Sequence, residues 1–368
     1  MMQYSPTITR INIAHDAPDL MCSSQWTSEP RVFPSAGFSL LDPSLQIEEE
    51  TLPTYQPEKY YPTQIGEVLD NRYQVLAKLG YGVISTVWFG RDLVRFNRKL
   101  LNHFAIAGPH GQHICIVHEP LGISASELMK WIPGRAMSLK DLKPCIRQLL
   151  VVLDFLPSIA HVIHTDIQLK NLLLPTPMPK ALSDFEEREV KAQSARKVLQ
   201  GRTIYTSARF PPGDGLPLLS DFGEAQLGDQ PHSEDIMPNP YRAPEVILKS
   251  NWGYKVDIWN VAMVAWDIVS TFTLIDGKNP DGVFDDRCHL AELPVFWDNE
   301  GKWKGLAPIL DKTLEDLAIN IKGEDKEGFL RWLRRALQWN PDDRPTALEL
   351  LYDEWMMKGL KLGNKIES

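Results

Sequence analysis

The chain has 368 residues, 43% hydrophobic and 24% charged, which is enough to bury a full core and fits one two-lobed unit better than two independent domains. Its net charge of −9 argues against a nucleic-acid binder, which needs a basic face; the charge suits arginine-rich peptides, but an ordinary acidic protein shows the same balance. Its four cysteines lack metal-site or disulfide spacing, so we expect reduced thiols in an intracellular protein. No segment reaches the ~18 uncharged apolar residues of a membrane span. We therefore expect a soluble protein without direct nucleic-acid or membrane contacts.

The first 70 residues show no strong periodic pattern. Residues 1–33 are rich in Ser, Thr and Pro, a composition that predicts a disordered arm. Residues 34–70 hold short extended pieces and the acidic run at residues 48–50. We interpret this run as a solvated face, with a docking element as the alternative.

Two segments with alternating hydrophobicity, residues 73–79 and 85–90, predict a pair of strands joined by a glycine-containing loop. Gly80 and Gly82 lie where a backbone can close over phosphates, and the β-branched Val87 can cover a base. Taken alone, such a pattern is more often a simple hairpin turn.

The next strong helix signal begins at Ser138, which with Asp141 forms an N-terminal cap. Apolar residues then recur at helical spacing from Leu142 to Leu156, and we assign this stripe to the core. The apolar segment 256–271 predicts a second, buried helix.

Directly after the apolar run 160–163, Asp166 and Asn171 lie five residues apart. Phosphoryl transfer requires a carboxylate that orients the hydroxyl nucleophile and oxygen ligands that hold Mg²⁺ on the phosphates. Asp166 fits the first role and Asn171 the second. By itself the pair is more commonly a solvated turn, so the interpretation depends on the motifs around it.

Two further motifs follow in the order that this chemistry needs. Asp221, in Asp-Phe-Gly, supplies a second metal carboxylate, and Glu245, in Ala-Pro-Glu, follows after a suitable interval. We expect Glu245 to pair with Arg344. The long interval from residue 171 to 221 predicts an insert at about residues 175–218, which we expect to be partly ordered and packed against the second, helical lobe.

Together these motifs resemble those of eukaryotic protein kinases, and specifically of the SR-protein-kinase family and its fungal relatives. The distinguishing segments are residues 80–88, with Ser85 at the third glycine position, residues 164–166, with Thr165 in place of an arginine, and residues 257–261. The resemblance covers residues 34–358. It implies an α+β, bilobal kinase domain at residues 71–358, with a small β-rich N-lobe at 71–121 and a larger helical C-lobe at 122–358.

The resemblance also implies ATP and Mg²⁺ as cofactors, with Asp166 as the catalytic residue and Asn171 and Asp221 as metal ligands. It implies protein substrates, serine in arginine-serine-rich proteins of mRNA processing, and a monomer in the cytoplasm and nucleus. The acidic segment 224–241 favours arginine in the substrate, although a solvated acidic loop explains these charges equally well. The residues implied to bind nucleotide are Leu79, Gly80, Gly82, Val87 and the backbone of Glu119 and Leu121, with His118 at the gatekeeper place.

The sequence departs from the family pattern in two ways. In the family, the strand after Asp92 carries a phosphate-binding lysine, and the helix that follows carries its glutamate partner. Here the chain runs from Asp92 almost directly into a segment that resembles the strand after that helix. The N-lobe should therefore lack one strand and its regulatory helix, together with both residues. Lys99 is the nearest lysine, in a predicted loop. Gln168 stands where a lysine should neutralise the transferring phosphoryl group, and Lys170 is a candidate to reach in.

These departures leave two main hypotheses open, with a structural protein that binds no nucleotide as a distant third. The first is an active serine/threonine kinase from whose sequence one coding segment is absent, which the clean loss of a strand and helix favours. The second is a pseudokinase that serves as a binding module, which Gln168 favours.

Overall fold

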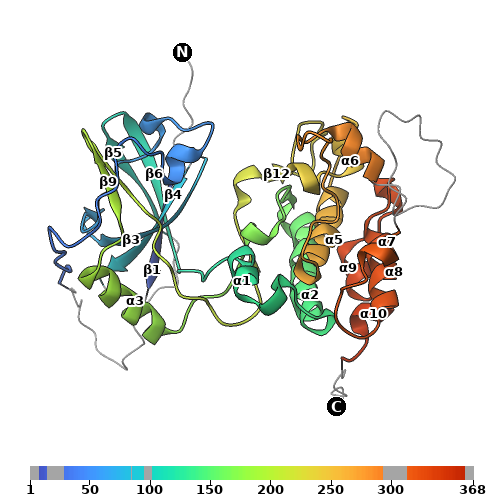
Figure 1. Cartoon of the computed structure of the whole chain (residues 1–368). Coiled ribbons are helices and arrows are strands. Elements are labelled where there is room, and N and C mark those ends of the chain that lie inside the picture. The colour runs from blue at the N-terminus through green and yellow to red at the C-terminus, as the bar shows by residue number, and fades with distance from the viewer. Residues whose placement is uncertain (1–7, 15–28, 84, 95–101, 293–312, 361–368) are drawn as a thin grey trace. The chain divides into compact units, whose positions relative to one another are not determined.

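The computed structural model describes residues 8–14, 29–83, 85–94, 102–292 and 313–360. These fall into two compact units (Figure 1). Unit 1 comprises residues 1–123 and 175–215, and unit 2 comprises residues 124–174 and 216–368. The first division, after residue 123, lies close to the expected lobe boundary, but the second shows that the insert belongs to unit 1.

Unit 1 contains a six-stranded sheet in the order β2-β3-β4-β1-β6-β5. The expectation that one strand is missing is wrong, because β1 pairs in parallel with both β4 and β6 and fills the place between them. For residues 8–14, β1 also corrects the expected disorder of the N-terminal arm; residues 1–7 and 15–28 lie outside the described residues. Without β1, the facing backbone groups of β4 and β6 would lack partners inside the sheet, which is costly. The strands are β1 (Ile8–Ala14), β2 (Val68–Leu69), β3 (Tyr73–Gly82), β4 (Ser85–Asp92), β5 (Asn102–Gly108) and β6 (Gly111–His118).

The insert supplies a helix, α3 (Pro179–Lys191), to the same unit. Its Phe185 packs edge-on against Phe89 of β4, with ring centroids 5.3 Å apart, and against Phe210 at 4.9 Å. Leu182 is buried in the same cluster. The expected packing of the insert against the helical lobe is therefore wrong: α3 buries its apolar face on the sheet, where the missing regulatory helix would have left apolar side chains uncovered.

The acidic run of residues 48–50 is not a solvated face. It forms a short 3-10 helix, Glu48–Thr51, whose three carboxylates bind other parts of unit 1. Glu49 pairs with the fully buried Lys78, Glu50 pairs with Lys197, and Glu48 accepts hydrogen bonds from the backbone N and the hydroxyl of Ser207 at 2.8 and 2.6 Å. Lys197 lies on a hairpin of the insert, formed by β9 (Arg196–Leu199) and β10 (Arg202–Tyr205). The run thus links the N-terminal extension to the insert.

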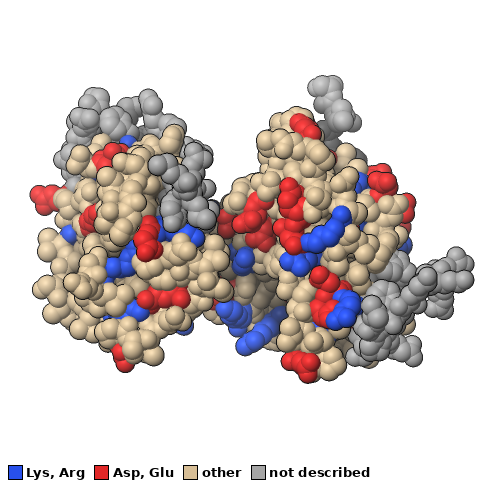
Figure 2. Space-filling model, turned by 90° about the horizontal axis from the view of Figure 1, so that it is seen from above, with Lys and Arg blue, Asp and Glu red and all other residues tan. Residues whose placement is uncertain are grey.

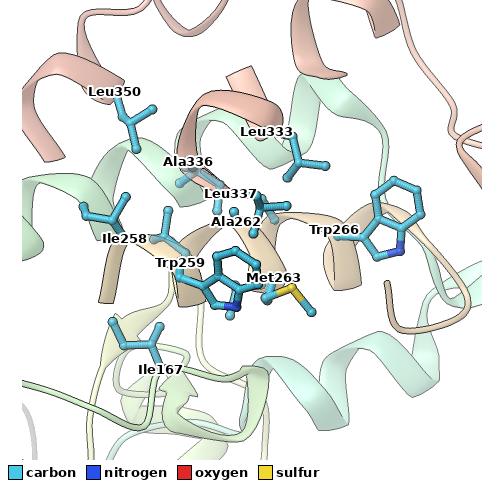
Figure 3. Close-up of a cluster of buried hydrophobic side chains, with 14 of the residues drawn as sticks. Ile167, Ile258, Trp259, Ala262, Met263, Trp266, Leu333, Ala336, Leu337 and Leu350 are labelled. Carbon is cyan, nitrogen blue, oxygen red and sulfur yellow. The ribbon is translucent and has the colours of Figure 1, made fainter. Parts of the chain in front are cut away.

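Unit 2 is mainly helical, as the sequence predicts. Ser138 caps α2 by accepting a hydrogen bond from the backbone N of Asp141, and the apolar stripe that begins at Leu142 is buried. α5 is buried along nearly its whole length and packs against α2 and α8 (Figure 3). The helices are α1 (Ala125–Trp131), α2 (Leu139–Phe155), α4 (Pro244–Ile247), α5 (Lys255–Val269), α6 (Asp286–Glu292), α7 (Leu314–Leu317), α8 (Lys326–Ala336), α9 (Ala347–Leu351) and α10 (Glu354–Met357).

Two short strand pairs hold the loops of unit 2 against this helical core. β7 (Val162–Ile163) pairs with β12 (Gln226–Leu227), and β8 (Leu172–Leu173) pairs with β11 (Leu218–Leu219). They frame the segment that contains Asp166 and Asn171. No helix in the described part of the chain is long and apolar enough to cross a membrane.

Candidate active site

The glycine loop joins β3 and β4 in unit 1. Gly80 lies opposite Val87 and Gly82 opposite Ser85 in the strand pairing. A Cβ added at Gly80 would meet nothing within 4 Å, and one at Gly82 would come no closer than 3.5 Å to the Ser85 hydroxyl. The fold itself therefore has room for a side chain at both positions. The expected role of the two glycines, to leave space for phosphates, stays a prediction.

A tyrosine that the sequence analysis missed supports this loop. The Tyr60 hydroxyl lies 2.7 Å from the backbone O of Val83 and 3.0 Å from that of Gly82, and donates to them. Burial raises the pKa of Tyr60 to about 12, so the hydroxyl keeps its proton. The available sequence signal for Tyr60 was the pair of aromatic residues at 60–61 in a mostly polar segment.

The residues expected around the base also lie in unit 1. Leu79 and Val87 are half-buried on β3 and β4, and His118 ends β6. Burial lowers the pKa of His118, and its hydrogen bond with the backbone O of Glu119 opposes that shift. Glu119 and Leu121 follow directly, at the place that the resemblance assigns to the hinge, and their backbone role stays a prediction. Lys99 lies outside the described residues.

In unit 2, a buried carboxylate holds the backbone of the catalytic loop. Asp257 of α5 accepts hydrogen bonds from the backbone N of His164 at 2.7 Å and of Thr165 at 2.9 Å. Thr165 has a φ of 66°, in the left-handed region that a β-branched residue rarely adopts, so these bonds hold a strained conformation. Burial raises the pKa of Asp257, and the two hydrogen bonds oppose that rise.

The side chains of the loop converge on Asp166. The Asn171 amide nitrogen donates to its Oδ2 at 2.7 Å, and the Gln168 amide donates to its Oδ1. Lys170 Nζ lies 3.8 Å from Oδ2. The family pattern expects a lysine at position 168. In this chain Lys170 places a positive charge beside the same carboxylate.

The structure brings the two proposed metal ligands to neighbouring chain segments. The backbone O of Asn171 accepts a hydrogen bond at 2.9 Å from the backbone N of Ser220, the residue before Asp221. Because the Asn171 amide nitrogen binds Asp166, its amide oxygen is the atom available for a cation. The described residues contain no group of three or more His, Cys, Asp and Glu that could hold a metal unaided. These two hard oxygen donors suit Mg²⁺, and they would hold it together with oxygen atoms from other ligands.

Two contacts of the segment after Asp221 tie it to the catalytic loop. The Phe222 ring lies edge-on to His164, with centroids 4.7 Å apart. The Thr165 hydroxyl donates to the backbone O of Glu224 at 2.8 Å. Thr165 therefore uses its side chain to bind the segment that follows Asp221.

The expected ion pair between Glu245 and Arg344 is confirmed. The guanidinium binds both carboxylate oxygens, at 2.6 and 2.7 Å, and both side chains are buried. Arg344 also lies over the Trp259 ring, 5.1 Å from its centroid. The pair fixes the end of the segment that begins at Asp221 to the helical core.

The role of a second, half-buried carboxylate, Asp267 of α5, was not found from the sequence. Tyr241, just before the Ala-Pro-Glu motif, donates its hydroxyl hydrogen to Asp267 Oδ2. Burial raises the pKa of Asp267 to about 6, although the hydrogen bond from Tyr241 opposes the rise. The available signal was a second aspartate, after Asp257, in a mostly apolar helix.

Comparisons with known proteins agree with this geometry. The protein kinase domain family matches residues 212–356. A serine/threonine protein kinase of Aspergillus fumigatus is 37% identical to this chain, over 90% of the chain and 96% of that protein. The chain belongs to the serine/threonine protein kinases and is a kinase enzyme.

Other relatives define the branch within this class. The serine/threonine-protein kinase SRPK of Physarum polycephalum is 27% identical over 84% of this chain and 91% of that protein, and protein kinase dsk1 of Schizosaccharomyces pombe is 22% identical over 76% and 75%. The chain is a member of the SR-protein-kinase-like family. A solved kinase domain with 19% identity, covering 81% of this chain and 98% of that one, shares the fold with a TM-score of 0.57.

Proposed function

We propose that this kinase transfers the γ-phosphoryl group of Mg-ATP to serine in arginine-serine-rich proteins, as a monomer in the cytoplasm and nucleus. The observation that carries the proposal is the Asp166 carboxylate, which accepts hydrogen bonds from Gln168 and Asn171 and has Lys170 at 3.8 Å. A carboxylate fixed in this way can orient a serine hydroxyl. The pseudokinase alternative is not favoured.

The residues divide the chemistry between them. When bound, Mg-ATP supplies the transferable phosphoryl group and a cation that offsets phosphate charge. Asp166 would orient the serine hydroxyl and accept its proton as the new O–P bond forms, while the bond from the γ-phosphorus to the bridging oxygen breaks and ADP leaves. Lys170 supplies positive charge next to this carboxylate, where charge develops on the phosphoryl oxygens. Asn171 and Asp221 would hold the metal ion.

The preference for arginine rests on the segment 224–241, which contains four acidic residues and no lysine or arginine. Asp229 and Glu234 have largely exposed side chains, at 77% and 64%. Asp235 forms an ion pair with Lys249 from outside the segment, which reduces its contribution. Figure 2 shows acidic side chains gathered on the helical unit, with lysine and arginine beside them. Exposed carboxylates bind the planar guanidinium of arginine through two hydrogen bonds.

Peptide phosphorylation tests the substrate class. We expect the protein to phosphorylate an arginine-serine repeat peptide faster than a lysine-serine or an acidic peptide, and more slowly as salt rises. The double variant Glu234→Lys, Asp235→Lys should raise KM for the arginine-serine peptide at least tenfold. Equal rates on the acidic peptide, or an unchanged KM in the double variant, would contradict the proposal.

The chain offers a matched control for this charge reversal. Asp184 and Glu187 on α3 have exposed side chains, at 62% and 60%, and each pairs with a lysine on the same helix. The double variant Asp184→Lys, Glu187→Lys therefore makes the same change of charge on unit 1. Its KM should match that of the wild type, so an equal rise in both variants would indicate a general charge effect.

A further inference from the structure

The glycine loop of unit 1 is bound by a side chain from the N-terminal extension. Tyr60 lies directly after a short 3-10 helix, Pro57–Lys59, and is 3% exposed, whereas Tyr81 and Val83 in the loop are 38% and 52% exposed. The Tyr60 hydroxyl donates to the backbone O of Gly82 at 3.0 Å and of Val83 at 2.7 Å. The loop thus exposes its side chains to solvent while its backbone is held from the buried side.

These hydrogen bonds determine which way the backbone of the loop faces. A trans peptide unit is planar, so its C=O and N–H point in opposite directions. The C=O of Gly82 is directed at the Tyr60 hydroxyl, and the N–H of Val83 belongs to the same peptide unit, so this N–H points away from Tyr60. Backbone N–H groups are what loops of this kind use to bind phosphate oxygens. The hydroxyl therefore sets the orientation of a group suited to a phosphate.

Tyr60 is itself fixed by the insert. Arg202 of β10 donates from Nη2 to the backbone O of Tyr60, and from Nη1 to the hydroxyl of Tyr55 at 3.1 Å. The rings of Tyr55 and Tyr60 contact each other, with centroids 5.5 Å apart. Because other residues hold both its backbone and its ring, Tyr60 offers a rigid support to a loop whose glycines have a wide conformational range.

A second contact from the same extension reaches the side chain between the two glycines. Glu49 pairs with the fully buried Lys78, and Lys78 Nζ lies 5.3 Å from the centroid of the Tyr81 ring. A cation at this distance is attracted to the face of an aromatic ring. The extension thus binds the loop at the Tyr81 side chain as well as at the carbonyls of Gly82 and Val83.

We propose that Tyr60 is a positioning residue for nucleotide binding, whose hydroxyl holds the glycine loop in the orientation that presents the N–H of Val83 to the phosphates. The inference rests on the proposed use of Mg-ATP and on the expected role of the glycine loop. The competing role is structural: the Tyr60 ring packs between the extension and the insert, and the hydroxyl only gives two carbonyls a partner.

Calorimetric titration of Tyr60→Phe with Mg-ATP and with adenosine separates these roles, because the variant keeps the ring and loses only the hydroxyl. We expect the Kd for Mg-ATP to rise about fivefold, as for the loss of one hydrogen bond, and the Kd for adenosine, which has no phosphate, to stay within about twofold. In peptide phosphorylation, the KM for ATP should rise with this Kd and the KM for the peptide should not change.

The neighbouring tyrosine provides a matched control. The Tyr61 hydroxyl donates at 2.6 Å to Glu67, a residue outside the glycine loop. Tyr61→Phe therefore removes a hydrogen-bonded hydroxyl from the same unit, and should change the Kd for neither ligand.

Each other outcome overturns the assignment. An unchanged Kd for Mg-ATP in Tyr60→Phe would show that the hydroxyl does not position the loop for phosphates. Equal losses for Mg-ATP and adenosine, or the same loss in Tyr61→Phe, would indicate a structural role. If the wild type binds no Mg-ATP, the proposed function fails and this assignment with it. If the wild type binds Mg-ATP and phosphorylates peptide while Tyr60→Phe behaves identically, only the Tyr60 assignment fails.

Discussion

The two units are assembled from the sequence in different ways. In unit 2, the groups around Asp166 come from one continuous stretch, residues 164–171, whose backbone donates hydrogen bonds to Asp257. In unit 1, the sheet is completed by β1 from the N-terminal region and covered by α3 from an insert more than 160 residues further along the chain. A kinase lobe can thus lose the local segment that normally completes it and keep its architecture, provided that distant segments pair with the same strands and cover the same face.

The largest effect is expected in unit 2. Asp166→Asn keeps the size of the side chain but removes the proton acceptor, so phosphoryl transfer should fall by about 10²–10⁴-fold. The Kd for Mg-ATP and the thermal stability should stay unchanged. Residual activity near the wild-type level in a peptide phosphorylation assay would remove Asp166 from its assigned role, whereas Asp184→Asn, at an exposed position on α3, should be silent.

The second prediction concerns the buried ion pair that fixes the end of the same segment. Glu245→Ala leaves the Arg344 guanidinium buried without its carboxylate, so the free energy of unfolding of unit 2 should fall by about 3–5 kcal/mol. Denaturant titration measures this loss of unfolding free energy. The pair of Arg334 and Glu315 is solvent-exposed, so Glu315→Ala should cost less than about 1 kcal/mol. Equal losses would contradict the distinction.

In unit 1, the third prediction tests whether α3, which comes from a distant part of the chain, stabilises the sheet. Phe185→Ala removes the α3 ring that contacts Phe89 and Phe210, and should destabilise unit 1 by about 3 kcal/mol. Met178→Ala, at a side chain 66% exposed beside the same helix, should have little effect. If Phe185→Ala is equally silent, α3 does not cover the sheet in solution.

The smallest effect is a dependence of stability on pH in unit 2. Burial raises the folded-state pKa of Asp267 from 3.8 to about 6, so the folded protein retains a proton that the unfolded chain loses. This contribution to stability is present below pH ~4 and is lost as the pH rises through about 6, a change of less than about 3 kcal/mol.

Asp267→Asn removes this titration but keeps an oxygen that can accept from Tyr241. Its unfolding free energy relative to the wild type should therefore increase between pH 4.5 and pH 7.5. His289, whose pKa burial lowers to about 4, titrates in the opposite sense but is common to both proteins and cancels in the difference. A difference that does not change with pH would show that Asp267 ionises normally.

Sequence patterns predicted unit 2 well because its site is local. The spacing of Asp166 and Asn171 and the capped helix after Ser138 are each carried by a short motif whose geometry the backbone fixes. The pairing of Glu245 with Arg344 joins residues 99 apart in sequence, and it was expected because each lies in a motif of the family pattern. Gln168 looked like a defect because sequence alone does not show that Lys170 reaches Asp166.

The replacements in unit 1 were not predictable in the same way. β1 has seven residues in a Ser-, Thr- and Pro-rich region, and its pairing with β4 and β6 depends on contacts between segments about 75 to 105 residues apart in sequence. Its three isoleucines were a usable signal for a strand, since β-branched residues favour strands. The acidic run at residues 48–50 resembled a solvated surface because its partners, Lys78, Lys197 and Ser207, lie far along the chain.

Hydrogen exchange of the amides of residues 9–13 in the intact protein tests the central claim most directly. β1 pairs with a strand on each side, so its amides should exchange slowly, with protection comparable to that of β4 and lost only when unit 1 opens. Exchange of these amides at the rate of an unstructured peptide, while β4 stays protected, would show that the N-terminal segment does not complete the sheet.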